Sequence, residues 1–477
     1  MPIHWIDYSI IILYFFVVIY VGWWAMQKVS SFDDYAVAGR GLPLAIFFAA
    51  IAATLCGGGA TIGRVAFMHT TGIVVFAGLM GVVINQIISG LYIAGRVHAI
   101  PNVYTVGDLC GLYYGRAGRL VSSVVCFLFC LGLFGVQILA MGAILQTATG
   151  IDLIPAALIS SAITLAYTWA GGMLGVTMTD AIQYVIIIVG VSLCGYLGIE
   201  RAGGYDAMIA QLQSMPQYVN NLKPFADWGV IKFAGLFFGF LFGEFCAPYF
   251  IQRYASTKSA KDSKVGVLIF SVHWLFFLAT TAGIGLASMA LQPDVKPDLA
   301  FTNLIRDVLP IGVTGLVLAA LLAAVMSSAA AFINTASVAY TRDIYNKFIN
   351  PKASQQDMLR QSRLSTLLVG GGAIVVAILF QDVFGLMLYI FKFWPSSVLP
   401  PLLLGIFWGK VSPRAGAPAM VIGGLAFLIW SDKILGEPFG IPANLVGISL
   451  NCLTLFLVHQ MTKRSVPTTG AYAPEVL

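Results

Sequence analysis

Apolar runs of about 20 or more residues recur along the whole chain, and they constrain its fold more than any other feature. Each run is long enough to cross the roughly 30 Å of hydrocarbon in a bilayer as an α-helix. Only 10% of the 477 residues are charged, whereas soluble domains carry roughly 25%. Because backbone groups in hydrocarbon must be satisfied within the segment, we predict an all-α polytopic membrane protein without a sizeable soluble domain.

Hydropathy predicts about thirteen transmembrane helices. Their expected limits are 8–26, 44–68, 73–94, 120–146, 154–169, 176–198, 230–251, 266–291, 311–340, 364–380, 383–407, 415–434 and 443–460. With this count, most of the 26 Lys and Arg residues, Arg253 among them, fall in loops on one side. The bias predicts an odd number of spans, with the N-terminus periplasmic and the C-terminus cytoplasmic. Because these basic residues are dispersed, they do not suggest a nucleic-acid partner.

Two of the expected spans contain residues that break helices. Three consecutive glycines, 57 to 59, interrupt the span 44–68, and the segments 392–395 and 400–401 interrupt the span 383–407. Unwound backbone is tolerated in a membrane only where it is buried in protein or lines a cavity. We therefore expect the glycine break to release carbonyl groups and to let a ligand approach the backbone closely.

A pair of hydroxyl side chains, Ser327 and Ser328, lies within another long apolar run. Hydroxyl groups in hydrocarbon need a partner, and a hard cation prefers oxygen ligands. A broken helix that offers carbonyl groups and a second helix that offers paired hydroxyls together predict a sodium site. The chain is therefore interpreted as an ion-coupled transporter.

Four segments of the chain resemble the sodium/solute symporter family, which includes bacterial proline, sialic acid and galactose carriers. In family order they are residues 32–40, 167–173 with 179–183, 249–253, and 323–328 with 342–345. The resemblance implies a five-plus-five inverted-repeat, leucine-transporter-like core with broken helices. It divides the chain into an extra N-terminal helix in residues 1–30, the ten-helix transport core in residues 31–410, and two C-terminal helices with a short cytoplasmic tail in residues 411–477.

The resemblance also implies a set of sodium ligands. These are the backbone carbonyls of Ala52, Leu55 and Ala324 and the hydroxyls of Ser327 and Ser328. Five mostly uncharged oxygens suit a weakly held monovalent ion, because tight binding of a divalent ion needs more negative charge.

A carboxylate lies in the middle of a hydrophobic span at Asp180, where it is costly unless it is paired or linked to an ion. In sialic acid carriers of the family, the matching aspartate joins further serines in a second sodium site. Ala330 and Ala331 stand at those serine positions here, so the resemblance favours one coupled sodium. Asp180 is a candidate for a second cation or proton site, or for a hydrogen bond to a neighbouring helix.

Three other charged residues are expected at membrane depth: Arg64, Glu244 and Lys392. Arg64 follows the glycine break by about one helical turn, and its guanidinium could bind a carboxylate through two hydrogen bonds. The alternative is a structural ion pair between Glu244 and Lys392 or Arg64. Two cations beside one anion favour a carboxylate-bearing solute, either an organic anion or a zwitterionic amino acid.

Other residues of the expected cavity are uncharged. Thr54, Gly58, Gly59 and Gln137 are further candidates for binding the substrate, although Gln137 could equally form a hydrogen bond between helices. The candidate gates are Tyr249, which aligns with a gating tyrosine of the family, and the aromatic residues Phe393 and Trp394.

The favoured function is a sodium-coupled symporter in a bacterial inner membrane that imports a small organic solute by alternating access. The alternatives are a symporter for a sugar or another neutral solute, a transporter-like solute sensor, and a passive channel. The sequence shows no arrangement of nucleophile and base and no phosphate-binding loop, so we do not expect an enzyme. The expected partners are the solute and the lipid bilayer.

Overall fold

The computed structural model describes residues 4–223, 229–380 and 383–462, and helices are the regular structure of this part of the chain. In chain order they are α1 Trp5–Met26, α2 Phe32–Val37, α3 Leu44–Leu55, α4 Arg64–Thr71, α5 Val74–Tyr92, α6 Ala94–Ala99, α7 Val106–Thr149, α8 Leu153–Arg201, α9 Tyr205–Ser214, α10 Val230–Gly243, α11 Pro248–Ser256, α12 Ala260–Leu291, α13 Ala300–Val308, α14 Val313–Ala339, α15 Gln355–Phe380, α16 Val383–Ser397, α17 Leu399–Phe407, α18 Gly416–Trp430 and α19 Ala443–Thr462.

Nine helices of the described chain are long and apolar enough to cross a membrane, and eleven spans result if each of two bent pairs counts as one. An all-α polytopic membrane protein is therefore confirmed, while the exact count of thirteen is not. The expected spans 154–169 and 176–198 both lie in α8, which consists of two helices joined at a kink where Gly172 has non-helical backbone angles. Because its 49 residues far exceed the roughly 20 needed to cross a bilayer, α8 has the length of two spans.

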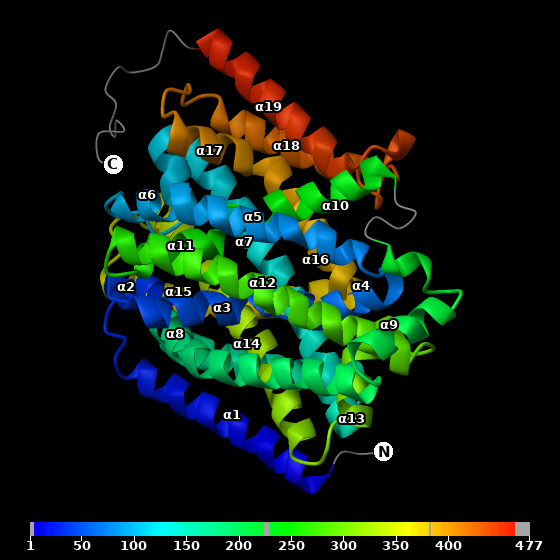
Figure 1. Cartoon of the computed structure of the whole chain (residues 1–477). Helices are drawn as coiled ribbons and strands as arrows, with labels where there is room; N and C mark the ends of the chain where they lie inside the picture. Colours follow the sequence, from blue (N-terminus) through cyan, green and yellow to red (C-terminus); the bar gives the residue numbers. More distant parts are fainter. Residues whose placement is uncertain (1–3, 224–228, 381–382, 463–477) are drawn as a thin grey trace.

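The helices stack as a long bundle in which α14 lies at the centre (Figure 1). Almost all of α14 is buried, and it packs against α3, α7, α8 and α15. Its many alanines and serines allow this close approach of neighbouring backbones. Helix α1 lies at one edge of the bundle, and α18 and α19 lie at the opposite edge (Figure 1). Most of the expected C-terminal tail, residues 463–477, lies outside the described residues.

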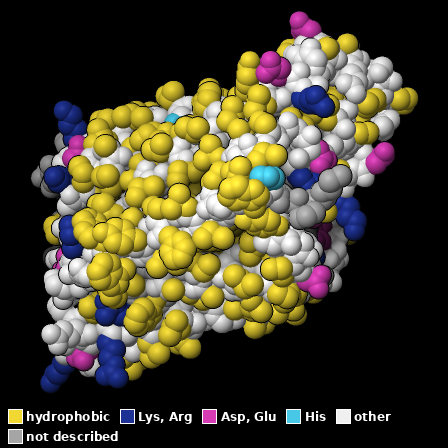
Figure 2. Space-filling view, turned by 90° about the horizontal axis from the view of Figure 1, so that it is seen from below, with side chains coloured by type: hydrophobic (Ala, Val, Ile, Leu, Met, Phe, Trp, Pro, Cys, Tyr) yellow, Lys and Arg dark blue, Asp and Glu magenta, His cyan; other side chains and the backbone are white. Residues whose placement is uncertain are grey.

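The outer surface of the bundle has the character expected of a protein in lipid. Figure 2 shows a broad apolar band across the face seen from below, with most charged side chains at its two ends. Large apolar side chains of α1 are exposed on the surface, including Leu13, Phe16 and Tyr20. A contiguous apolar band of this size would be unfavourable in water, so it marks the lipid-facing belt.

Both expected helix breaks are present, although one is displaced. Helix α3 meets the helical segment Gly59–Thr71, which ends in α4, at an angle of 59°, and Gly385–Ser397 of α16 meets α17 at 49°. The second break falls at Val398, because α16 continues through Pro395 to Ser397. The segment 392–395 is thus helical, which corrects the expected position of the interruption.

A third break was not expected from the sequence. The predicted span 230–251 is divided into α10 and α11, which are separated by residues 244 to 247. Cys246 has a φ of +54°, which a regular helix cannot accommodate, and Pro248 then occupies the first turn of α11. The break places Glu244 at the end of a helix rather than in its middle.

The kink of α8 yields a test of the packing. Gly172 has a φ of +51°, and a Cβ atom at this position would collide with the Tyr35 ring. We expect Gly172→Ala to destabilise the protein by about 1–3 kcal/mol, because the backbone would be strained and Tyr35 displaced. The measurement is the midpoint of thermal unfolding in detergent.

The matched control is Gly371→Ala, in α15, where a Cβ atom would meet no atom within 4 Å. This substitution should leave the midpoint unchanged or raise it slightly, because alanine favours a helix over glycine. Equal effects of the two substitutions would contradict the assigned kink.

Candidate functional site

The break between α3 and α4 leaves backbone groups without helical partners. Helix α3 ends at Leu55, and the N–H of Cys56 bonds to the Ala53 carbonyl at 3.1 Å, so the Ala52 carbonyl loses its usual partner four residues on. The Gly58 N–H donates to Oε1 of Gln137 on α7 at 2.7 Å. Because an N–H needs an acceptor, this bond fixes the orientation of the Gln137 amide and leaves its Nε2 for another partner.

The close packing of neighbouring helices leaves no room for a side chain at the three glycines of the break. A Cβ atom at Gly57 would overlap the Ser328 side chain of α14, one at Gly58 would overlap Ala140 of α7, and one at Gly59 would overlap Met387 of α16. We expected the glycines to admit a ligand to the backbone. Gly57 and Gly59 do line the cavity beside the break, although the direction in which their Cβ atoms would point is filled by other helices.

The end of α3 is in direct contact with the serine pair of α14. The Ser328 hydroxyl is within hydrogen-bonding distance of the Thr54 carbonyl and lies 3.1 Å from the Ala324 carbonyl. All five of the expected sodium ligands belong to these two segments, which the fold places together: Ala52, Leu55, Ala324, Ser327 and Ser328. The Thr54 carbonyl is an additional oxygen that the sequence did not single out.

Asp180 lies beside this cluster, and it is engaged by protein groups. The Ser327 hydroxyl donates to Asp180 Oδ1 at 2.6 Å, and Arg253 Nη2 lies 3.2 Å from Oδ2. Arg253 Nη2 also donates to the Thr54 hydroxyl at 2.6 Å. The sequence had placed Arg253 among the loop residues, but its side chain is only 1% exposed. Burial of the Asp180 carboxylate is thus compensated by a buried cation.

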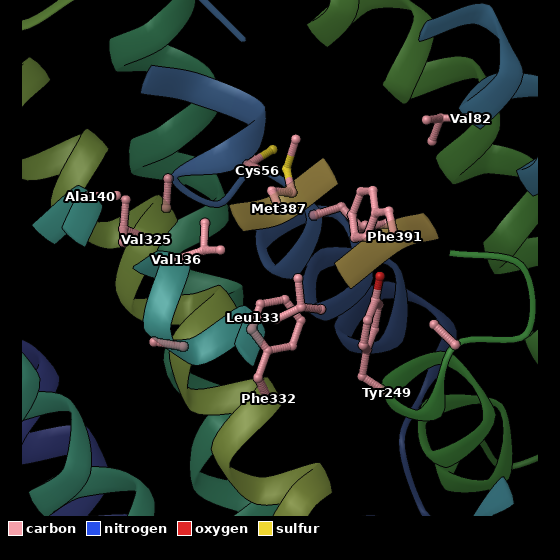
Figure 3. Close-up of a cluster of buried hydrophobic side chains, with 14 of the residues drawn as sticks. Cys56, Val82, Leu133, Val136, Ala140, Tyr249, Val325, Phe332, Met387 and Phe391 are labelled. Atoms are coloured by element: carbon pink, nitrogen blue, oxygen red, sulfur yellow. The ribbon is translucent and has the colours of Figure 1, made fainter. Parts of the chain in front are cut away.

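A cavity adjoins the break and the serine pair. Water-sized molecules fit into about 40 Å³ of it, so the cavity is small in this structure. Thr54, Leu55 and Ser328 line it, so the expected sodium site borders the cavity directly. Its remaining walls are mostly apolar, and Figure 3 shows several of these buried side chains, among them Leu133, Phe332 and Met387. The apolar lining residues are Leu79, Val82, Leu133, Phe240, Phe332, Met387 and Phe391.

One cation lines this cavity. Arg64 Nη1 donates to the Thr281 hydroxyl at 3.2 Å, and its guanidinium lies over the Trp274 ring at 4.8 Å. None of the ion pairs formed by the described residues involves Arg64. Stacking on an aromatic face stabilises the charge without using the edge of the guanidinium. Part of the guanidinium edge therefore remains for a ligand.

The sequence did not identify Trp274 as a site residue. It lines the cavity, and its indole Nε1 is buried without a hydrogen-bond partner in the described part of the chain. A single tryptophan in an apolar span is indistinguishable from a packing residue. Its position at the cavity, beside the Arg64 guanidinium, is a consequence of tertiary structure.

Glu244 also lines the cavity, at the unexpected break between α10 and α11. Its Oε1 accepts a hydrogen bond of 2.6 Å from the Tyr249 hydroxyl. Among the described residues it forms no direct ion pair with Arg64 or Lys392, but Glu244 and Arg64 line the same cavity and attract each other electrostatically, so the pairing of these two stays an alternative. The cavity therefore contains one cationic and one anionic side chain.

The structure does not bring Lys392 to this cavity. Lys392 pairs with Glu437 at 3.6 Å, and both line a separate cavity between α16 and α18. The reason is the uninterrupted α16: Met387 and Phe391 face the first cavity, whereas Lys392 lies on another side of the helix.

The candidate gating residues divide in the same way. Tyr249 and Trp394 both pack against Phe129, with ring centroids 6.5 Å and 5.1 Å away, and Trp394 Nε1 donates to the Phe245 carbonyl at 2.8 Å. Phe393 instead packs against Phe427 of α18. Tyr249 and Trp394 thus belong to one buried aromatic cluster around Phe129, and Phe393 belongs to the interface with α18.

The close packing of Gly57 against Ser328 predicts how the expected sodium site would respond to an added methyl group. We expect Gly57→Ala to weaken sodium binding roughly tenfold or more, about 1.4 kcal/mol, because its Cβ would push Ser328 away from the end of α3. The measurement is sodium titration by thermal shift or calorimetry. Gly371→Ala serves as the control, and equal sodium affinity in the two variants would contradict the assigned contact.

Comparisons with known proteins agree with this architecture. The model of the sodium:solute symporter family matches residues 35–430. The osmoregulated proline transporter OpuE of Bacillus subtilis is 24% identical, with 96% of this chain and 95% of the relative aligned. The sodium/proline symporter of Escherichia coli is 26% identical over 88% and 86% of the two chains. The sodium/glucose cotransporter of Vibrio parahaemolyticus is 25% identical over 91% and 86%.

Solved structures show the same fold. A sodium-coupled sialic acid symporter, in a substrate-bound outward-open state, superposes with a TM-score of 0.80 at 20% identity, covering 97% of this chain and 98% of the other. The nucleobase-cation-symport transporter Mhp1 superposes with a TM-score of 0.63 at 13% identity, covering 91% and 95%. These similarities confirm the predicted leucine-transporter-like fold class.

Proposed function

The chain belongs to the sodium:solute symporter family, and from this membership we propose that it couples sodium entry to the uptake of a small solute that carries a carboxylate. Sodium-coupled symport follows from the family itself. The observation that supports a carboxylate is Arg64, which lines the cavity without an ion-pair partner among the described residues. A guanidinium in a largely apolar cavity is stabilised when an anion binds it through paired hydrogen bonds.

Other groups around the cavity fit the same class of solute. The Gln137 amide is held by Gly58 with Nε2 available, and the Trp274 N–H has no partner in the described chain. Both are donors, as a carboxylate requires. Glu244 is an acceptor that would complement the ammonium group of a zwitterion. Several relatives are proline transporters, which is consistent with a solute of this kind.

The proposed sodium site is formed by the carbonyls of Ala52, Leu55 and Ala324 with the hydroxyls of Ser327 and Ser328. Sodium bound there would join the end of α3 to α14 and fix the geometry of the break. Since Leu55 and Ser328 also line the cavity, an ordered break would favour solute binding. By linkage, the solute must then raise the affinity for sodium by the same factor.

The proposed cycle begins with sodium and solute binding from the periplasmic side and ends with their release into the cytoplasm. Tyr249 and Trp394 are the proposed gating residues, because they meet in the aromatic cluster around Phe129. An inward membrane potential adds about 2.3 kcal/mol per charge at 100 mV to the driving force. We place the carrier in a bacterial inner membrane, with the N-terminus periplasmic and residues 31–410 as the transport core.

Removal of a proposed sodium ligand tests the coupling. We expect Ser328→Ala to weaken sodium activation of uptake roughly tenfold or more, about 1.4 kcal/mol, because one hydroxyl ligand is lost. Ser327→Ala should act in the same direction. Uptake into proteoliposomes is measured as a function of sodium concentration, and an unchanged half-activating concentration in both variants would exclude this site.

Removal of the cavity cation tests the class of solute. A screen of organic acids, amino acids and sugars by sodium-dependent thermal shift would first identify a ligand. We then expect Arg64→Gln to weaken binding of a carboxylate by about 1.5–3 kcal/mol, because a charge-assisted hydrogen bond is lost.

Lys392→Gln is the matched control for this test, because Lys392 lies outside the cavity and pairs with Glu437. It should leave solute affinity unchanged. Unaltered affinity in Arg64→Gln, or preferential binding of a neutral sugar, would contradict the carboxylate proposal.

A further inference from the structure

Among the described residues, Asp180 is the acidic side chain that forms a hydrogen bond with a proposed sodium ligand, and both of its oxygens have protein partners. Oδ1 accepts from Ser327 at 2.6 Å, and Oδ2 lies 3.2 Å from Arg253 Nη2 and 3.5 Å from the Thr54 hydroxyl. The Asp180 and Arg253 side chains are 0% and 1% exposed. Both oxygens of this carboxylate are therefore engaged by protein groups.

The cation that balances the charge of Asp180 is a side chain of the protein itself. A carboxylate in the membrane interior is costly unless it takes up a proton or is paired with a cation, which can be an ion or a side chain. Arg253 on α11 supplies one, and Nη2 is the guanidinium atom that makes its hydrogen bonds. Nε and Nη1 are buried without partners in the described chain, so the contacts with Asp180 and Thr54 are what hold the guanidinium in place.

The Ser327 hydroxyl gains a defined direction from the same carboxylate. An ionised carboxylate only accepts hydrogen bonds, so the hydroxyl hydrogen of Ser327 points at Asp180. The oxygen lone pairs then point away from Asp180 and remain free for a cation. Groups that orient a ligand in this way commonly change metal affinity by roughly 10–100-fold when they are removed.

We propose that Arg253 occupies the place of a second cation at Asp180, so that the carrier binds one sodium ion, and that Asp180 positions the Ser327 hydroxyl for that ion. Asp180 is a positioning residue and does not itself bind sodium. This inference rests on the proposed sodium site at Ser327 and Ser328.

The test counts bound sodium, because the ion is known while the solute is not. Equilibrium binding of ²²Na⁺ to the purified full-length chain in detergent should give one ion per chain in the wild type. Asp180→Asn should still bind one ion, with an affinity about tenfold weaker, because Ser327 loses its orientation. Two ions in the wild type that fall to one in Asp180→Asn would place a second sodium at Asp180 and overturn the proposal.

Removal of the Arg253 guanidinium gives the converse prediction. We expect Arg253→Gln to bind two ions per chain, because the uncompensated carboxylate recruits a second sodium. The double variant Asp180→Asn with Arg253→Gln should return to one ion, because the carboxylate is gone. Size-exclusion profiles and thermal midpoints verify folding. One ion in a folded Arg253→Gln chain, or two in the double variant, would overturn the proposal.

Ser328→Ala separates this inference from the function on which it rests. If Ser328→Ala loses sodium binding, the proposed sodium site is supported. If Arg253→Gln then binds only one ion, the role of Arg253 alone is rejected. A wild-type chain that binds no sodium, or full binding in Ser328→Ala, would reject the proposed site itself.

Discussion

The contact between the unwound end of α3 and the serine pair of α14 is the interaction on which the rest of the structure depends. Its closeness requires Gly57, since any side chain there would meet Ser328. The backbone groups released by the break must find partners within the protein, because no water is available in hydrocarbon. Gln137 satisfies the Gly58 N–H, and the Ser328 hydroxyl faces the Thr54 carbonyl. A break of this kind is stable only when other helices surround it.

The same contact links the polar cluster to the cavity. Thr54 connects the two, because its side chain bonds to Arg253 while its backbone approaches Ser328. A change at the proposed ion site would therefore reach residues that line the cavity within one helical turn. Arg253 lies on α11 and Asp180 on α8, so the cluster also ties the broken pair α10 and α11 to its neighbours. This arrangement gives a short physical path for coupling between ion and solute.

Much of this could be predicted from local sequence. Apolar runs fix the membrane class, and Gly57 to Gly59 and the hydroxyls at 327 and 328 stand out because they are unusual in hydrocarbon. The break at Glu244 was missed because its only local sign is Pro248, which is equally common at the start of an ordinary helix. Lys392 was misplaced because a charge in an apolar run does not reveal which side of the helix faces the cavity.

The sequence by itself determined that the chain crosses the membrane many times as helices, where one helix breaks, and which hydroxyls are available for a cation. These properties depend on neighbours within a few residues, and the hydrocarbon environment makes them costly to violate. Only the tertiary structure decided that Arg253 pairs with Asp180 and that Arg64 lies on Trp274. These partners are 73 and 210 residues apart in the chain, and their meeting depends on how the helices pack and rotate about α14.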